Sequence, residues 1–375
     1  MNVLIAPDAF KDSLAAKAVV EAMQRGVLQF SPNANCFHIS ASDGGEGFLQ
    51  AVQGYQKNLS EIFVNTVDPF GRPIHVEYVW DASSKTAYIE LAKASGIELL
   101  FEKERDALQS STYGTGLQIK DALSKGAEKI YVGIGGSATN DAALGIAHAL
   151  GYDFLDKESE SLPPKGASLS EISFITPPKE DFSRIQFFAI NDVLNPLFGP
   201  SGAAYTYAAQ KGASKEEIVF LDRGLQHLDA LVQKSFRLQN AQVPGSGAAG
   251  GTAYGLKSFF NAEFISGTSF ILGLSNFHDI LSEEKIDLIL TGEGKIDHQT
   301  AFGKWVHGII QEATPYKVPV MAVCGKLDLD DDGVKSLGLL DARQVYDPSK
   351  PVQYSFDHAD ELVTARTFQL LQANF

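Results

Sequence analysis

Short apolar runs alternate along the chain with longer segments in which apolar residues recur at helical spacing. Residues 2–6 (NVLIA) and 36–41 (CFHISA) predict strands, because both runs are short and strongly apolar. Residues 13–30 and 45–55 predict helices, and Ser13 is placed to act as the N-cap of the first one. This strand–helix–strand–helix order favours a parallel sheet with helices on both of its faces.

The middle of the chain has a different pattern. Residues 62–81 and 85–92 contain closely spaced strand signals with Pro-Phe-Gly turn chemistry between them, which predicts an antiparallel meander. Residues 129–136 and 185–192 then predict strands of the earlier kind. Residues 213–236 predict a long amphipathic helix.

The strand–loop–helix pattern returns at residues 285–294 and 318–326. We therefore predict an α/β protein of two domains with a cleft between them. One domain, with a Rossmann- or flavodoxin-like parallel sheet, is built from both chain ends, residues 1–65 and 285–375. The other is an inserted mixed α/β domain, residues 66–284.

Charge and hydropathy narrow the class of partner. The 375 residues carry a formal net charge of −15. Nucleic acids and anionic membranes require clustered Lys and Arg, so we expect neither as a partner. The chain has no apolar run of membrane-spanning length, and its start, MNVLIAPDAFKDS, lacks the regions of a secretory signal. We expect a cytoplasmic enzyme or binding protein, either a monomer or a homodimer.

Zinc and thiol chemistry are not indicated. Cys36 and Cys324 both lie inside apolar runs, so we expect reduced core residues rather than a metal pair or a disulfide. The eight histidines form no HxxxH or HExxH pair, which argues against a catalytic zinc.

Six apolar runs each end in a cluster of small, acidic or basic residues. These clusters hold Asp8 and Lys11; Asp43 and Glu46; residues 133–141; Asn191 and Asp192; Glu293, Lys295 and Asp297; and Lys326. In open parallel sheets, ligands bind outside the carboxyl ends of the strands. We therefore expect the clusters to line one binding site.

Two of these regions are rich in glycine. GIGGSATNDAALG (133–145) and PGSGAAGGTAYG (244–255) would let backbone N–H groups approach an anion before a helix N-terminus, which predicts phosphate binding. The first loop carries no lysine, so we expect Lys11, Lys295 or Lys326 to supply its positive charge. We expect Asp141 to cap the following helix or to orient a neighbouring group.

The carboxylates suggest Mg²⁺, which binds one or two carboxylates together with phosphate oxygens. An anion cradle, a metal site and a carboxylate that accepts a hydroxyl proton are the components of phosphoryl transfer. The chain lacks the P-loop signature, since GGTAYGLKS (250–258) has one residue too many before Lys257.

Two other functional classes remain open at this point. GSGAAG (245–250) satisfies the GxGxxG pattern of a nicotinamide-dependent oxidoreductase, although it follows only the short AQVP and not a clear strand. A non-catalytic protein that binds sugar acids in its cleft is the second alternative.

The chain resembles the bacterial glycerate kinase family that lacks a Walker A motif. The resemblance rests on six motifs in order: IAPDAFKDSL, DGGEGF, GGSATNDAALG, DVLNPLFGP, PGSGAAGG and TGEGKIDHQTAFGK. It implies ATP-dependent phosphorylation of D-glycerate to 2-phosphoglycerate, with a kinase of another small hydroxy acid as the alternative. The last fifty residues fit the family pattern poorly.

From these residue types we predict specific roles. Asp192 is the candidate general base on the glycerate hydroxyl, and Glu293 and Asp297 are the Mg²⁺ candidates. Lys11 and Lys295 would bind the substrate carboxylate or a phosphate, and Lys295 and Asp297 are counted with Asp192 as catalytic. The predicted substrate-binding residues are Asp8, Lys11, Ser13, Asp43 and Glu46. The predicted nucleotide-binding residues are Gly135, Gly136, Ser137, Thr139, Asn140, Gly247, Gly250 and Gly251.

The sequence departs from the family pattern at several of these motifs. The family usually has Arg where this chain has Lys295, and a lysine cannot form the two-pronged contact of a guanidinium group. The family also has Gly where this chain has Ala142 and Ala143, and often Cys where it has Asn191.

Overall fold

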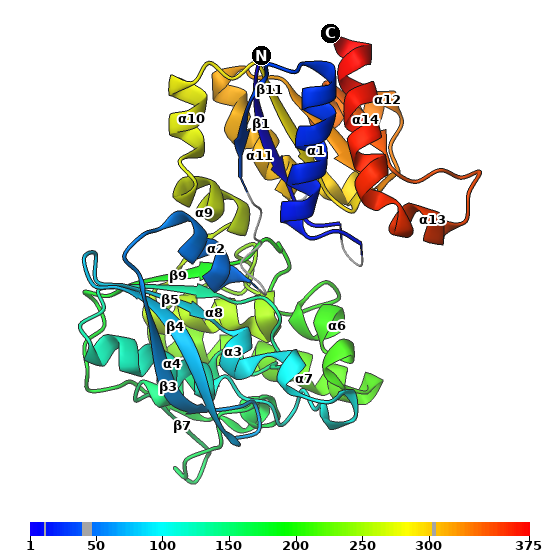
Figure 1. The fold of residues 1–375 in the computed structure, drawn as a ribbon. Helices are drawn as coiled ribbons and strands as arrows, with labels where there is room; N and C mark the ends of the chain where they lie inside the picture. The colour runs from blue at the N-terminus through cyan, green and yellow to red at the C-terminus, as the bar shows by residue number, and fades with distance from the viewer. Residues whose placement is uncertain (11–12, 40–46, 302–304) are drawn as a thin grey trace. The chain divides into compact units, whose positions relative to one another are not determined.

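The computed structural model describes residues 1–10, 13–39, 47–301 and 305–375, and Figure 1 shows its fold. The chain divides into two compact units. The first unit consists of Met1–Ser42 and Thr268–Phe375, and the second unit is Asp43–Gly267. Both units combine helices with a largely parallel sheet, so the predicted α/β class is confirmed.

The first unit contains a five-stranded sheet in the order β15-β13-β11-β1-β2, with all neighbours parallel. Its strands are β1 Asn2–Pro7, β2 Asn35–His38, β11 Leu288–Gly292, β13 Val320–Cys324 and β15 Asp341–Gln344. Numbered in chain order from the β2 edge, this is the 2-1-3-4-5 arrangement of flavodoxin-like sheets, as predicted. A small parallel pair, β12 Lys295–Ile296 and β14 Lys326–Leu327, follows β11 and β13.

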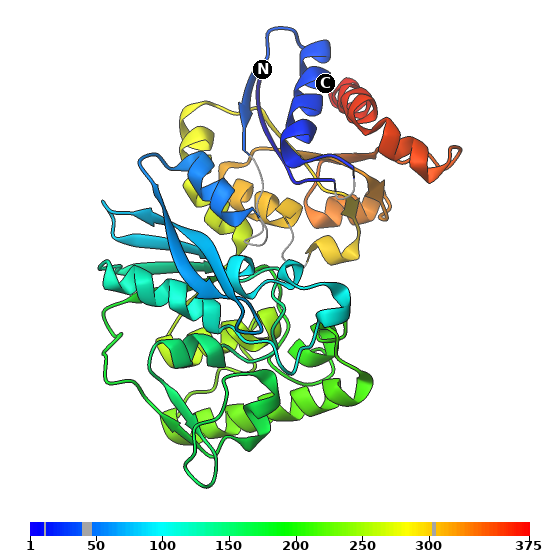
Figure 2. The ribbon, with the colours of Figure 1, turned by 60° about the horizontal axis from the view of Figure 1, so that its bottom comes forward.

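Helices cover both faces of this sheet, which explains why β11 and β13 are buried along their whole length. In Figures 1 and 2, α1 and α14 lie side by side on one face. On the opposite face, α11 packs on the sheet, and the Trp305 indole donates to the Ala6 carbonyl at 2.7 Å. The helices are α1 Ala16–Phe30, α9 Gly267–Leu274, α10 Phe277–Glu283, α11 Trp305–Ala313, α12 Asp331–Leu337, α13 Val352–Asp357 and α14 Ala359–Asn374.

The first helix begins later than predicted. The N-cap of α1 is Ala15, so the prediction of Ser13 as its N-cap is wrong. The backbone N–H of Ser13 instead donates to the Phe10 carbonyl at 2.9 Å, in a turn between β1 and α1.

The second unit is built on a six-stranded mixed sheet in the order β10-β9-β6-β5-β4-β3. Its strands are β3 Ser60–Val67, β4 Pro73–Asp81, β5 Thr86–Glu90, β6 Lys129–Gly133, β9 Gln186–Ile190 and β10 Glu263–Ile265, and β7 Asp153–Leu155 pairs separately with β8 Phe174–Thr176. The predicted meander is confirmed, because β3, β4 and β5 are antiparallel neighbours. From β5 to β10 the pairing is parallel.

The helices of the second unit are α2 Phe48–Tyr55, α3 Ala92–Ser95, α4 Tyr113–Ser124, α5 Leu144–Ala149, α6 Ala203–Tyr207, α7 Lys215–Phe236 and α8 Ala248–Phe260. The long α7 begins at a capping box, in which the Ser214 hydroxyl accepts from the Glu217 backbone N–H and the Glu217 carboxylate accepts from the Ser214 N–H. The predicted helix at residues 213–236 is therefore confirmed.

The two units share the discontinuous plan of the predicted domains but have different bounds. Residues 60–65 belong to β3, which pairs with β4 inside the second unit and not with the first sheet. At the other junction, the first unit starts at Thr268, so α10 belongs to it.

Both cysteines are free. Cys324 is buried as expected, whereas Cys36 is only partly buried. Within the described ranges, no helix combines the length and the apolar character needed to cross a bilayer.

The close packing of α1 on α14 depends on Gly26. A Cβ at this position would lie 2.6 Å from both the Thr364 carbonyl oxygen and the Thr367 Cβ. Gly26→Ala should lower the free energy of unfolding, because overpacking costs about 1–3 kcal/mol and exceeds a helix-propensity gain of up to about 1 kcal/mol. Calorimetric melting checks this.

The matched control is Gly54→Ala in α2, where a Cβ would meet no described atom within 4 Å. This variant should be neutral or slightly more stable than the wild type. An equal rise in melting temperature for both variants would contradict the packing argument.

Candidate functional site

In the first unit, the carboxyl ends of β1, β11 and β13 are joined by backbone hydrogen bonds. The Asp8 N–H donates to the Gly292 carbonyl at 2.8 Å, and the Gly325 N–H donates to the Glu293 carbonyl at 3.1 Å. Three of the predicted polar clusters therefore begin on one edge of one sheet, as the parallel topology requires.

Lysines and aspartates form an ion-pair network beyond this edge. The Lys295 ammonium lies 2.9 Å from an Asp297 oxygen and 3.1 Å from an Asp328 oxygen. Lys326 contacts the same Asp328 oxygen at 3.6 Å. Hydrogen bonds to the two carboxylates, with Asp297 first, raise the pKa of Lys295, so this side chain stays cationic.

Glu293 is the most enclosed carboxylate of this edge, with 7% of its surface exposed. Its Oε1 accepts a hydrogen bond of 2.7 Å from the Thr300 hydroxyl, and that hydroxyl accepts one of 3.1 Å from the Asp297 backbone N–H. One threonine thus links the Glu293 carboxylate to the backbone of Asp297, the second residue predicted to bind Mg²⁺.

The donor chemistry of Glu293 and Asp297 fits Mg²⁺, which prefers hard oxygen ligands. Within the described part of the chain, no cluster of three or more His, Cys, Asp or Glu side chains could hold a metal by itself.

Several predicted substrate residues also lie near this edge. Asp8 follows β1 directly, and its carboxylate accepts a hydrogen bond from the Ala9 N–H at 2.7 Å. Ser13 is exposed in the turn before α1. Lys11, Asp43 and Glu46 lie outside the described residues.

In the second unit, the two glycine-rich loops pack directly on each other. The Ala142 N–H donates to the Gly250 carbonyl at 3.2 Å. A Cβ on Gly250 would lie 2.1 Å from the Thr139 carbonyl oxygen, so only glycine allows this approach. Gly250 and Gly251 also have positive φ angles of 66° and 85°. Two segments more than a hundred residues apart therefore form one surface.

The strand end that carries Asp192 lies beside these loops. Asp192 follows β9, which pairs in parallel with β6, the strand that leads into the first glycine loop. The Gly247 N–H donates to the Asn195 carbonyl at 2.9 Å, which ties the second glycine loop to the segment after Asp192. Three of the six sequence motifs thus meet at one edge of the second sheet.

The first glycine loop contains buried polar atoms that have no hydrogen-bond partner among the described residues. They are the Thr139 hydroxyl and both amide atoms of Asn140. A buried polar group without a partner costs about 1–3 kcal/mol, and ligands or ordered water usually supply the missing bond. This loop therefore has the character of a binding site.

Asp141 connects the start of two helices. Its Oδ2 accepts from the Thr112 N–H and hydroxyl, both at 2.8 Å, and from the Gly145 N–H at 3.2 Å. Burial raises the pKa of the Asp141 carboxyl, and these hydrogen bonds oppose that rise. Because Gly145 lies in the first turn of α5, the expected capping role is confirmed.

Ala142 and Ala143, which stand where the family usually has Gly, both adopt left-handed backbone conformations with φ of 49° and 61°. This region costs a non-glycine residue roughly 1–2 kcal/mol. Both side chains are fully buried, so the packing of their methyl groups offsets part of that cost.

The sequence analysis missed Lys211, which lies at the end of the 3₁₀ helix Ala209–Lys211. Only 3% of this residue is exposed. Its ammonium donates to the Ser137 hydroxyl at 2.8 Å and to the Thr139 carbonyl at 2.6 Å. Lys211 of the same unit therefore contacts this loop, in addition to the lysines Lys11, Lys295 and Lys326 that were expected to supply its positive charge.

Burial lowers the pKa of Lys211 to about 7, and the charge of Asp141 opposes this shift. The sequence around it, AAQKGAS, resembles an ordinary exposed helix end. Only the packing of residues distant in sequence reveals that this lysine is enclosed.

The Lys211 pKa leads to a testable pH dependence. The folded pKa of about 7 lies below the reference value of 10.5, so from pH 7 to 10 the unfolded chain binds this proton and the folded protein does not. The free energy of unfolding should therefore rise with pH by up to about 1.4 kcal/mol per unit from this group. We expect denaturant titrations at pH 7, 8 and 9 to show that the free energy of unfolding of the wild type increases with pH relative to that of Lys211→Met.

Lys234→Met, on the exposed side of α7, reports the effect of removing a surface lysine. A stability difference between wild type and Lys211→Met that stays constant across this range would show that the ammonium is not enclosed as described.

Comparisons with known proteins agree with this arrangement of motifs. The model of the glycerate kinase family matches residues 3–373. A glycerate kinase of Halalkalibacterium halodurans is 39% identical over 90% of this chain and 89% of its own length. A glycerate 2-kinase of Escherichia coli is 36% identical over 89% of this chain and 87% of its own.

A crystal structure from Salmonella typhimurium LT2, described under the glycerate kinase 2 name, matches with a TM-score of 0.80 and 31% identity. It covers 100% of this chain, which in turn covers 98% of that structure. The similarity to these proteins in sequence and in fold therefore extends along nearly the whole chain. The chain belongs to the glycerate kinase family.

Proposed function

We propose that this protein transfers a phosphoryl group from ATP to D-glycerate and forms 2-phosphoglycerate. Membership of the glycerate kinase family supports the reaction class, and a relative named glycerate 2-kinase supports the product. The observation that carries the proposal is that two glycine loops meet beside the strand end that bears Asp192. The first of these loops contains buried polar atoms without a described partner, and the enclosed Lys211 contacts it.

The glycine loops of the second unit would bind the phosphates of the nucleotide. Because the Lys211 ammonium donates to the Ser137 oxygen, the Ser137 hydroxyl can direct its own hydrogen to a further acceptor such as a phosphate oxygen. Thr139 and Asn140, whose buried side-chain polar atoms have no partner among the described residues, are also proposed to bind the nucleotide. The glycines proposed to let phosphate approach the backbone are Gly135, Gly136, Gly247, Gly250 and Gly251.

Asp192 is the proposed general base. A carboxylate at the end of β9 can accept the proton of the attacking glycerate hydroxyl as the bond to phosphorus forms. Lys295, held cationic by its aspartate neighbours, would bind a carboxylate or phosphate of the reactants. Asp8, Lys11, Ser13, Asp43 and Glu46 remain the proposed substrate-binding set.

Glu293 and Asp297 would hold Mg²⁺. The bound ion would neutralise charge on the phosphate oxygens during transfer. The Thr300 hydroxyl orients the Glu293 carboxylate, while Lys295 pairs with Asp297 and limits its repulsion with Glu293.

An oxidoreductase is not favoured by the geometry of GSGAAG. The chain turns before this segment, and Val243 lies in a turn instead of a strand. Within the segment, Ala249 and Gly250 have left-handed conformations, which interrupt the helix start on which a dinucleotide fold depends. The functional alternative that remains is phosphorylation of another small hydroxy acid.

Replacing the proposed base tests the mechanism. Asp192→Asn keeps the shape of the side chain and removes its basicity, so kcat for ATP-dependent phosphorylation of D-glycerate should fall by about 10²–10⁴-fold. A coupled assay of ADP release with D-glycerate and related hydroxy acids measures it. The control is Asp181→Asn, an exposed aspartate of the same unit. Wild-type turnover in Asp192→Asn would rule out the base assignment.

The metal assignment has its own test. Chelation by EDTA should abolish ADP release, and added MgCl₂ should restore it. Glu293→Gln should raise the Mg²⁺ concentration at half-maximal rate by about tenfold or more, equivalent to about 1.4 kcal/mol of binding. Asp332→Asn, exposed on α12, is the matched control. Full activity in EDTA would exclude the ion from the reaction.

A further inference from the structure

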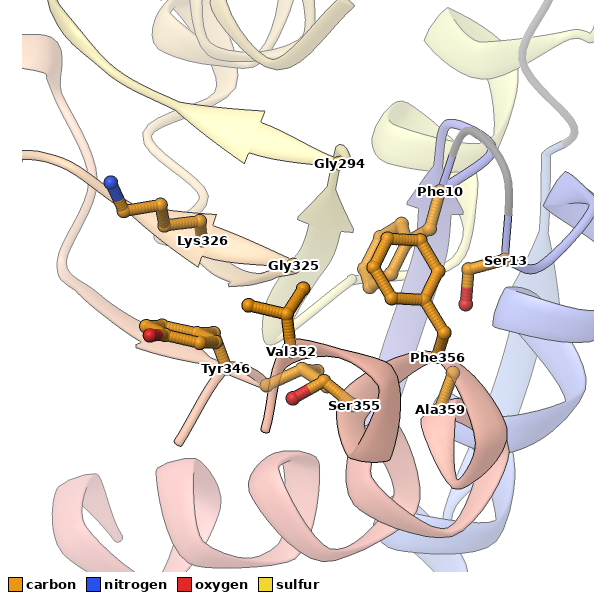
Figure 3. A pocket seen from close by; sticks show the side chains of 11 residues that line it. Phe10, Ser13, Gly294, Gly325, Lys326, Tyr346, Val352, Ser355, Phe356 and Ala359 are labelled. Carbon is orange, nitrogen blue, oxygen red and sulfur yellow. The ribbon is translucent and has the colours of Figure 1, made fainter. Parts of the chain in front are cut away.

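The first unit contains a cavity of about 370 Å³, and of the described residues given roles in the proposed reaction only Ser13 lines it. It lies at the carboxyl edge of the five-stranded sheet and is closed on one side by α13 and the start of α14. Figure 3 shows its apolar walls. The apolar side chains that line it are Phe10, Val345, Tyr346, Val352, Phe356 and Ala359.

The cavity lies at the point where the strand order of the sheet reverses. From β1 the chain leads to β2 on one side, while β11 and the later strands lie on the other. Phe10 follows β1 and Gly294 follows β11, so the two strands at this switch point both contribute to the cavity. Switch points are preferred ligand sites in open α/β sheets.

Helix α13 has large apolar side chains that are exposed to solvent. Val352 and Phe356 are 57% and 40% exposed, although both are large apolar residues. Exposed apolar side chains that gather at a cavity are typical of a binding site. They come from the last fifty residues, which were expected to fit the family pattern poorly but which the family model covers as far as residue 373.

One polar atom in the wall also lacks a partner. The Ser355 hydroxyl oxygen is buried and has no hydrogen-bond partner among the described residues. In Figure 3, Tyr346 and Lys326 lie at one end of the cavity, and Phe10 and Phe356 lie at the other. The cavity therefore combines apolar walls with a few polar atoms, including one that is unsatisfied.

We propose that this cavity binds the adenine ring of ATP. A purine ring is planar, has apolar faces and carries hydrogen-bonding atoms on its edge, which matches the aromatic walls of Phe10 and Phe356 and the unpartnered Ser355 hydroxyl. Glycerate is a small hydroxylated anion and has no apolar surface to bury here. The inference rests on the proposed function, because that reaction supplies the nucleotide.

Phe356→Ser removes one wall of the cavity. Because the variant lacks the aromatic face on which adenine would pack, the KM for ATP should rise about tenfold or more, while the KM for D-glycerate stays near the wild-type value. Ser355→Leu, which removes the hydroxyl and puts a larger apolar side chain at the cavity wall, should have the same effect. Tyr354→Ser is the matched control, since this aromatic residue lies on the same helix and is not part of the cavity wall.

Adenosine binding, measured by calorimetry, separates this inference from the proposed function, because adenosine lacks phosphates and needs no turnover. Adenosine should bind wild type and Tyr354→Ser, and binding should be lost in Phe356→Ser and Ser355→Leu. If wild type binds adenosine in this way but does not phosphorylate glycerate, the proposed function fails and the adenine site stands. An unchanged KM for ATP, or a rise in the KM for glycerate alone, in both cavity variants would overturn the site.

Discussion

The close approach of two glycine-rich backbones is the constraint on which the candidate site of the second unit depends. Gly250 faces the Thr139 carbonyl without room for a side chain, and the Ala142 N–H bonds to the Gly250 carbonyl. This contact places α5 and α8 beside each other. It also holds the first glycine loop, to which Lys211 donates a hydrogen bond at the Thr139 carbonyl. A single methyl group on Gly250 would push the two glycine loops apart, because the packing leaves no space for it.

Lys211 and Asp141 are both buried close to this contact. A buried ammonium and a buried carboxylate are each unfavourable alone, and hydrophobic residues would often stabilise a core as well. Here Lys211 donates to the Thr139 carbonyl of the loop, and Asp141 accepts from the Thr112 N–H at the start of α4, so both residues restrain the loop. Under the proposed function, such restraint would favour phosphate binding, because donors that are already oriented lose little entropy when a ligand binds.

Much of the fold could be predicted from the sequence because its signals are local. β1, β11 and β13 are continuous buried apolar runs, and the Ser214–Glu217 box marks the start of α7 within a few residues. That polar clusters at the ends of neighbouring strands would share one edge of their sheet followed from the predicted parallel topology alone. Strand pairing is not local, so a strand signal at residues 60–65 could not show that its partner is β4.

The parts of the site that escaped prediction depend on distant contacts. Lys211 and Ser137 are 74 residues apart, and nothing near Lys211 in sequence distinguishes it from a surface lysine. Ser13 matched the N-cap pattern, yet the turn that follows β1 uses its backbone differently and delays the helix to Ala16. The lining of the apolar cavity comes from both chain ends, so no single motif could describe it.

The pairing of β1 with β11 also determines when the first unit can form during synthesis. The Thr291 hydroxyl bonds to the Ala6 carbonyl across 285 residues of sequence, and β1 has its final neighbours only after β11 has been made. The second unit lies between them and has its own core, so it can fold first while the apolar N-terminal strand waits. Loss of the C-terminal segment that carries β11 would therefore leave β1 without one of its two neighbouring strands.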